Sequence, residues 1–222
     1  MDNALIVFAK YPIPGFVKTR LARDIGNDAA ASLYRQFITY TIRKFARPDR
    51  DYKLIVAVAQ EQYVARFSLD FPGADQYVSQ CKGELGARMQ LAIKQCLDDG
   101  FKKIAVIGTD SPHLPVALVQ DAFEVLNQND VVIGPADDGG YYLLAVKDNF
   151  PFLFHAISWG TEQVLKQTKA VIDENKLTPA YLPENYDIDN IKNLRRLFKD
   201  APEILKGTAE CLSKEIYRQM SS

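Results

Sequence analysis

The sequence predicts a three-layer α/β/α fold around a mostly parallel, mixed sheet. Short apolar runs, typical of strands that are buried on both faces, alternate with amphipathic helical patterns through about the first 130 residues. The chain has 222 residues, which is enough for one substantial core. Its 47% hydrophobic and 25% charged residues are ordinary for a globular protein.

The predicted strands share an apolar, β-branched pattern: residues 4–9, 53–59, 76–79, 104–108, 131–135, 141–146 and 180–182. The loop Ala136-Asp-Asp-Gly-Gly140 separates the last two long strands. This spacing is short enough for an antiparallel pair, which would add a mixed edge to the sheet.

Helical patterns fill much of the remaining chain: from Asn27, over residues 84–97 and 115–127, and over about residues 161–174, 189–198 and 202–218. Thr161 and Asp189 are the expected N-terminal caps of the helices that they precede. We expect one domain over residues 1–222, with a C-terminal helical appendage from about residue 184.

Charge and cysteine content exclude several classes of protein. A net charge of −1 gives no reason to expect nucleic acid or an anionic membrane as a partner. Cys81, Cys96 and Cys211 are far apart, and the chain has two histidines, so neither a disulfide framework nor a zinc site is expected. No signal peptide or membrane-spanning run is visible, and the expected location is the cytoplasm. The oligomeric state is not indicated.

The loop after the first strand carries Lys10, Lys18 and Arg20. Ligands of α/β sheets bind outside the carboxyl ends of the strands, where this loop should lie. In an extended segment Lys18 and Arg20 would point the same way, and both can hold phosphate oxygens. The alternative is a solvated basic loop without a ligand.

Asp110 follows the strand 104–108 directly. A carboxylate at the carboxyl end of a strand is well placed to hold Mg²⁺ or Mn²⁺ through hard oxygen ligands. The alternative is a helix cap, which fits Ser111 better because the apolar-periodic residues begin later. We therefore expect Asp110 to be a metal ligand.

Two acids stand in the turn between the last two long strands. Asp-Gly is a strong hairpin signal, so Asp137 and Asp138 could simply form the turn. If the turn faces Asp110, Asp138 becomes a second metal ligand or a base for an acceptor hydroxyl. Asp137 and Tyr141 are then further candidates for contact with the acceptor molecule or with a second metal ion.

Three other segments begin predicted helices. Gly83 would let the backbone approach a ligand at a helix N-terminus, where anions are favoured and where Arg88 lies in the first turns. Trp159 either lines an acceptor pocket or packs in the core. Asp187 either assists the cap Asp189 or approaches the metal.

The usual nucleotide-binding fingerprints are absent. The chain has no GxGxxG after the first strand and no GxxxxGK[ST], which argues against a dinucleotide dehydrogenase and a P-loop enzyme.

Taken in order, the motifs resemble a bacterial family of uncharacterised proteins assigned as glycosyltransferases, with a GT-A-like, nucleotide-diphospho-sugar transferase fold. The resemblance covers about residues 4–198 and rests on these segments: Phe8-Ala-Lys10, Gly15–Leu21, Gly83–Met89, Gly108–Pro112, Gly134–Tyr142, Trp159–Thr161 and Asp187–Asp189. More distantly, the chain is similar to guanylyltransferases that act on molybdopterin or phospholactate.

The resemblance implies site residues. The nucleotide would be bound by Ala9, Lys10, Lys18, Arg20, Gly83, Leu85 and Arg88. Asp110 would bind the metal and act with Asp138 in catalysis. The chain departs from familiar glycosyltransferases because Thr109-Asp110-Ser111 stands where they have Asp-x-Asp.

Three functions fit these residues. The first is a metal-dependent transfer of a sugar from a nucleoside diphosphate sugar to an unknown acceptor, which releases a nucleoside diphosphate. The second is nucleotidyl transfer from a nucleoside triphosphate to a small phosphorylated acceptor, which releases pyrophosphate. The third is nucleotide binding without turnover, in which case Asp110→Ala would leave the cellular function intact.

Overall fold

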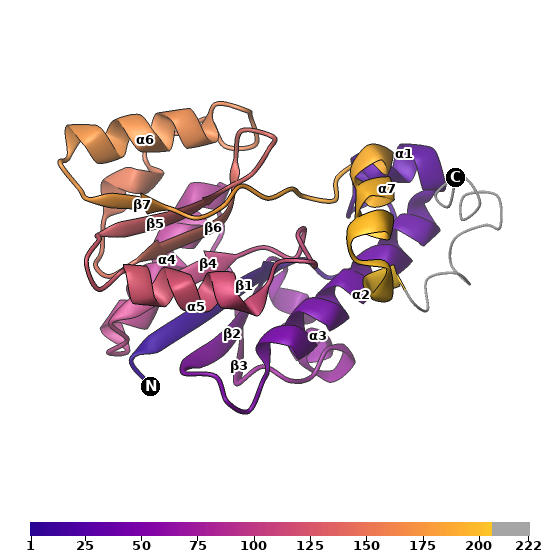
Figure 1. The fold of residues 1–222 in the computed structure, drawn as a ribbon. Helices are drawn as coiled ribbons and strands as arrows, with labels where there is room; N and C mark the ends of the chain where they lie inside the picture. The colour runs from indigo at the N-terminus through magenta and orange to yellow at the C-terminus, as the bar shows by residue number, and fades with distance from the viewer. Residues whose placement is uncertain (206–222) are drawn as a thin grey trace.

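The computed structural model describes residues 1–205, which form a seven-stranded sheet with helices on both faces (Figure 1). The strand order is β3-β2-β1-β4-β6-β5-β7. The strands are β1 (Asn3–Ala9), β2 (Tyr52–Val58), β3 (Gln76–Ser79), β4 (Lys103–Ile107), β5 (Val131–Pro135), β6 (Tyr141–Val146) and β7 (Pro179–Tyr181). The predicted three-layer α/β fold is therefore confirmed, and every predicted strand is present.

The position of the reversed strand differs from the prediction. β6 is antiparallel to both of its neighbours, β4 and β5, while the other described pairs are parallel. The hairpin of β5 and β6 was expected to form a mixed edge. Instead β6 lies inside the sheet, because it pairs with β4 on one side and with β5 on the other, and β7 forms the edge beyond β5.

Alternate residues of the inner strand β1 explain why the sheet is covered on both sides. Leu5 and Val7 belong to one core and Ala4 and Ile6 to the other, and all four are buried. A strand that is buried on both faces reads as a continuous apolar run, as the sequence predicted.

The helices divide between these two cores. The helices are α1 (Thr19–Ile25), α2 (Asn27–Phe45), α3 (Val64–Asp70), α4 (Leu85–Asp98), α5 (Val116–Val125), α6 (Val164–Glu174) and α7 (Ile191–Asp200). Apolar residues of α4 and α6 pack in the core of one face, while those of α1, α2, α3, α5 and α7 pack in the other. None of the helices within residues 1–205 combines the length and hydropathy needed to cross a bilayer.

Two short helices, α1 and α3, were not predicted. Each has seven residues, and α3 buries only Phe67, so neither shows a clear helical period. The presence of α1 changes the geometry of the first loop, because Arg20 lies in a helix and not in an extended segment.

The described part of the predicted C-terminal appendage packs into the main core. Leu194 and Leu197 of α7 and Leu205 of a final 3₁₀ turn, Pro202–Leu205, are buried there. In Figure 1, α7 lies beside α1 and α2. Residues 206–218 of the last predicted helix lie outside the described residues.

Candidate functional site

Strand register brings the predicted site segments to one edge of the sheet. Val7 of β1 is level with Ile107 of β4, and Ile107 is level with Leu143 of β6. Because β1 and β4 are parallel and β6 runs the other way, the ends of β1 and β4 and the beginning of β6 meet at this edge. The loops that carry Lys10 and Asp110 and the first residue of β6, Tyr141, are therefore neighbours.

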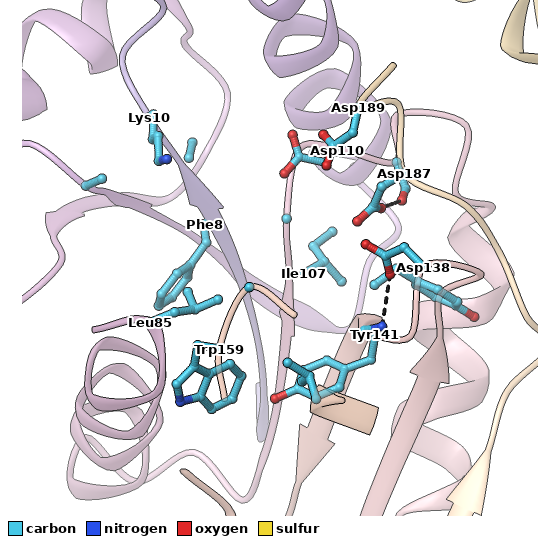
Figure 2. A pocket seen from close by; sticks show the side chains of 18 of the residues that line it. Phe8, Lys10, Leu85, Ile107, Asp110, Asp138, Tyr141, Trp159, Asp187 and Asp189 are labelled. Carbon is cyan, nitrogen blue, oxygen red and sulfur yellow. Dashed lines mark hydrogen bonds between the residues drawn. The ribbon is translucent and has the colours of Figure 1, made fainter. Parts of the chain in front are cut away.

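A cavity of about 700 Å³ opens at this edge (Figure 2). One side, here called the acidic wall, consists of Asp110, Asp138, Asp187 and Asp189. The other side, the aromatic wall, consists of Phe8, Leu85, Tyr141 and Trp159. Four cationic side chains also line the cavity: Lys10, Lys18, Arg20 and Arg88. The pocket can therefore receive a ligand with an anionic part and an apolar or ring-shaped part.

The acidic wall is organised around the buried ammonium group of Lys18. Its Nζ lies 2.5 Å from Asp110 Oδ1 and 3.0 Å from Asp189 Oδ1. The Lys18 side chain is 3% exposed, whereas those of Asp110 and Asp189 are 46% and 39% exposed. Burial lowers the pKa of Lys18, but the charges of Asp110 and then Asp189 outweigh this effect and hold the pKa above its ordinary value.

A tyrosine on α2 links the loops that follow β1 and β4. The hydroxyl of Tyr34 accepts a hydrogen bond from the Lys10 backbone N–H at 3.1 Å and lies 2.8 Å from the hydroxyl of Thr109. Burial, and secondly the charge of Asp110, raises the pKa of Tyr34 to about 12, so its hydroxyl stays protonated. Tyr34 was not among the predicted site residues. The only sequence signal for a role in the site is that Tyr34, which carries a hydroxyl group, stands among the buried residues of α2.

The segment before α7 brings Asp187 to the acidic wall. The backbone N–H of Ile188 donates to the carbonyl of Asp110 at 2.9 Å. The buried hydroxyl of Ser111 lies 3.0 Å from the carbonyl oxygen of Tyr186 and forms a short hydrogen bond with the Asp187 carboxylate. These contacts fix two carboxylates from distant parts of the chain beside each other.

The Asp187 carboxyl group lies in a crowded, anionic environment. Burial and the neighbouring charge of Asp110 raise its pKa to about 7, although the hydrogen bond from Ser111 acts in the opposite direction. Ionising a buried carboxyl group beside another carboxylate costs free energy, and a cation placed between the two groups would stabilise the ionised form.

The aromatic wall depends on close packing. A Cβ atom on Gly86, the second residue of α4, would lie 2.4 Å from Nε1 of Trp159, so only glycine allows this approach. The rings of Tyr141 and Trp159 meet edge to face at 6.3 Å. The Tyr141 hydroxyl is buried without a hydrogen-bond partner among the described residues, and burial raises its pKa above the ordinary value.

The turn between β5 and β6 presents only one of its two acids to the pocket. Asp138 Oδ1 accepts a hydrogen bond from the Gly140 N–H at 2.9 Å, and Asp138 lines the cavity. Asp137 instead pairs with Arg196 of α7 at 3.3 Å and does not line the cavity. Gly139 has φ +86° and packs against the Glu162 backbone, which a Cβ would approach to 2.3 Å.

Most of the predicted site residues converge on this cavity. Those that line it are Ala9, Lys10, Lys18, Arg20, Leu85, Arg88, Asp110, Asp138, Tyr141, Trp159 and Asp187. Gly83 and Asp137 do not line it. The backbone of Lys18 is left-handed, with φ 48°, and α1 begins at the next residue, so the expected side-by-side display of Lys18 and Arg20 on an extended segment does not occur.

Two predicted helix caps are also corrected. Asn190, not Asp189, caps α7 by accepting a hydrogen bond from the Asn193 N–H at 2.9 Å. This frees Asp189 to pair with Lys18. Thr161 accepts a hydrogen bond from Gln163 at 3.2 Å in the turn before α6, but α6 begins later and has no side-chain cap.

The donor set of the acidic wall matches a small, hard divalent cation. Within residues 1–205, no group of three or more His, Cys, Asp or Glu side chains is arranged to hold a metal. Mg²⁺ characteristically takes one or two carboxylates and completes its shell with substrate phosphates and water. Asp110 and Asp187 therefore fit an ion that arrives with a phosphate ligand better than one held by protein alone.

Comparison with known families gives one match. The family model described as "Uncharacterized protein conserved in bacteria (DUF2064)" matches residues 41–161. No curated protein matches the chain.

Solved structures extend the similarity to the whole chain. A crystal structure from Desulfovibrio desulfuricans G20, described as a candidate nucleotide-diphospho-sugar transferase, has 32% identity and a TM-score of 0.87, covering 99% of this chain and 98% of that one. CMP:2-keto-3-deoxy-manno-octonic acid synthetase in complex with CTP has 10% identity and a TM-score of 0.58, covering 91% of this chain and 99% of that one. Rv0371c from Mycobacterium tuberculosis H37Rv, in complex with manganese, has 13% identity and a TM-score of 0.53, covering 90% and 100%. The last two similarities establish the fold alone.

Proposed function

Because the chain belongs to the bacterial DUF2064 family and has the nucleotide-diphospho-sugar transferase fold, we propose that it transfers a glycosyl group from a nucleoside diphosphate sugar in a metal-dependent reaction. One observation carries this proposal. Free cations, crowded carboxylates and an aromatic wall line a single cavity at the carboxyl ends of β1 and β4.

The cations divide into those available to a ligand and one that is not. Lys10 and Arg20 are exposed at the cavity and form no ion pair within the described residues. Arg88 donates to the Gln80 side chain at 3.1 Å and has a buried Nε without a partner. These three side chains would hold the diphosphate, with Arg offering two-pronged contacts and Lys a point charge. Lys18 is already bound to Asp110 and Asp189.

Asp110 and Asp187 would hold Mg²⁺ or Mn²⁺. When bound, the ion would neutralise negative charge on the diphosphate leaving group. A relative in complex with manganese has the same fold, which supports this assignment. The Ser111 hydroxyl would keep the Asp187 carboxylate oriented toward Asp110.

Asp138 is the proposed general base for the acceptor hydroxyl. Its Oδ1 is held by the Gly140 N–H, which leaves Oδ2 free to accept a proton. Asp138 stands on the acidic wall, while Trp159 and Tyr141 on the facing wall offer ring surfaces to a sugar (Figure 2). Asp137 has no part in this proposal because it faces Arg196.

Calorimetric titration of the protein with a panel of nucleoside diphosphates in the presence of Mn²⁺ tests the proposal. We expect at least one to bind with a dissociation constant of about 1 mM or lower. Asp110→Asn should abolish the metal-dependent part of the heat, whereas Asp121→Asn on the exposed side of α5 should not. A panel in which no nucleotide binds would rule the proposal out.

A nucleotidyl transfer is the second candidate, and one observation favours it. A synthetase with the same fold is complexed with CTP, so this architecture accommodates a nucleoside triphosphate. The two candidates differ in product. Incubation with a nucleoside triphosphate and phosphorylated acceptors would release pyrophosphate in this case, and a nucleoside diphosphate sugar would not be consumed.

A further inference from the structure

Lys18 is the most enclosed charged group of the site. Its Nζ lies between two carboxylates and is 5.9 Å from the ring centres of both Tyr34 and Phe37 on α2. Its backbone is left-handed at φ 48°, a conformation that costs energy for a residue with a Cβ. The chain therefore accepts local strain and the burial of an ammonium group at this position.

The exposed fractions of Lys18, Asp110 and Asp189 indicate from which direction the ammonium group approaches the two carboxylates. Asp110 and Asp189 are each about two-fifths exposed and line the cavity, whereas Lys18 is almost completely enclosed. The ammonium group thus meets the carboxylates from the protein side and leaves their outer oxygens toward the cavity. Its single positive charge offsets part of the negative charge of Asp110, Asp187 and Asp189.

We infer that Lys18 is a built-in counter-ion of the acidic wall, which holds Asp110 and Asp189 in place and keeps the affinity for a divalent cation low until a nucleotide supplies phosphate ligands. This inference rests on the proposed function for the identity of the metal. It replaces the sequence-based assignment of Lys18 as a diphosphate ligand and makes it a positioning residue.

The physical argument is one of competing charges. An ammonium group 2.5 Å from Asp110 lowers the negative potential that a second cation would experience at the same carboxylate. Phosphate oxygens bound by Lys10, Arg20 and Arg88 would restore that potential and add ligands. Metal and nucleotide should therefore bind with positive cooperativity, and the cooperativity should depend on Lys18.

Binding of Mn²⁺ alone, measured by electron paramagnetic resonance of the free ion without any nucleotide, tests the inference. Lys18→Met and Lys18→Gln remove the charge, and the glutamine amide keeps a hydrogen-bond donor for the carboxylates. Both variants should bind Mn²⁺ about tenfold or more tightly than the wild type. Lys18→Arg, which keeps the charge, should retain the weak affinity of the wild type.

Thermal melting supplies a second readout and guards against a folding defect. The neutral variants should melt below the wild type without metal, and Mn²⁺ should raise their midpoints more than it raises that of the wild type. Lys102→Gln is the matched control, because Lys102 is ion-paired with Asp2 at 2.7 Å and does not line the cavity. It should not change Mn²⁺ binding.

The outcomes separate this inference from the proposed function. If the neutral variants bind Mn²⁺ no more tightly than the wild type, the counter-ion role is overturned, even when the wild type binds nucleotides. If they gain Mn²⁺ affinity while the wild type binds no nucleotide, the counter-ion role holds and the proposed substrate is wrong.

Discussion

The two walls of the cavity are held in place by different forces. The acidic wall gathers carboxylates from three distant segments through ion pairs and hydrogen bonds, chiefly those of Lys18 and Ser111. The aromatic wall is held by contact, with Trp159 packed against a glycine of α4 and against the Tyr141 ring. Charge should therefore control the first wall, and volume should control the second.

This difference makes the two walls separable by experiment. A change of charge without a change of shape on the acidic wall should remove metal-dependent chemistry and leave the organic part of the ligand bound. A change of volume under Trp159 should weaken binding of the organic part of the ligand and leave the metal-dependent chemistry in place. Substitutions that affect both functions equally would show that the two walls do not act independently.

The largest effect is expected for Asp110→Asn, which keeps the shape of the side chain. It removes the proposed metal ligand that also pairs with Lys18. The rate of nucleoside diphosphate release should fall by about 100-fold or more. Release can be followed with a coupled assay at saturating donor.

Trp159 fluorescence can show whether this variant still binds the nucleotide. Trp159 is the only tryptophan of the chain, so the signal comes from the aromatic wall alone. Titration of Asp110→Asn with nucleotide should still perturb it. A variant that keeps more than a tenth of the wild-type rate would contradict the role of Asp110.

The next effect tests the aromatic wall through Gly86→Ala. The added methyl group would stand 2.4 Å from Trp159 Nε1, so the indole ring must move. Affinity for the donor should fall about fivefold, since an aromatic contact contributes about 1 kcal/mol beyond its buried area. The Trp159 emission should shift, while Mn²⁺ affinity should stay within about twofold of the wild type.

Lys94→Ala is the control on the same helix. Lys94 pairs with Asp98 on the exposed side of α4 and does not line the cavity. It should change neither the emission nor the donor affinity. Unchanged emission in Gly86→Ala would show that the wall tolerates the extra volume.

A smaller effect, on stability, is expected for Asp187→Asn. Burial and the charge of Asp110 raise the pKa of Asp187 from 3.8 in the unfolded chain to about 7 in the folded protein. The unfolded state therefore loses its proton first, and this carboxyl group costs the native protein stability as the pH rises from about 4 to 7. Without metal, Asp187→Asn should be more stable than the wild type by at least about 1 kcal/mol at pH 7, and the gain should shrink toward pH 4.

Chemical denaturation at a series of pH values measures this gain. The groups around Asp187 are Asp110, Asp189, Lys18 and Ser111, and only the first two add repulsion. Asp137→Asn provides the comparison, because Asp137 is paired with Arg196 at the surface and should change stability by less than about 0.5 kcal/mol. A gain of equal size at pH 4 and pH 7 would exclude charge crowding as its cause.

The sequence predicted the strands and the position of the site because both depend on local signals. A strand that is buried on both faces has a continuous apolar run, as in β1 and β4, and the residues after such strands must meet at one edge. Asp110 could be placed in this way from its neighbours alone. The inner position of β6 could not, since strand order depends on pairing between distant segments.

Sequence patterns could not predict which residues pair with the residues of the site. The ion pair of Lys18 with Asp189 joins residues 171 positions apart, and no local spacing indicates it. Asp189 has a good local explanation as a helix cap, but Asn190 caps α7 and Asp189 pairs with the buried Lys18. The short helix α1 could not be predicted either, because its two buried residues give too little helical periodicity.

The smallest effect distinguishes two adjacent tyrosines on opposite faces of the sheet. The Tyr141 hydroxyl is buried without a partner within the described residues, whereas the Tyr142 hydroxyl donates to the Pro183 carbonyl at 2.9 Å. Tyr141→Phe should therefore leave stability unchanged or raise it by less than about 1 kcal/mol, and Tyr142→Phe should lower it by about 1 kcal/mol. Urea denaturation of both variants measures the difference. A loss of stability in Tyr141→Phe as large as in Tyr142→Phe would mean that the Tyr141 hydroxyl has a bonding partner, such as an enclosed water, and that the aromatic wall is held by more than packing.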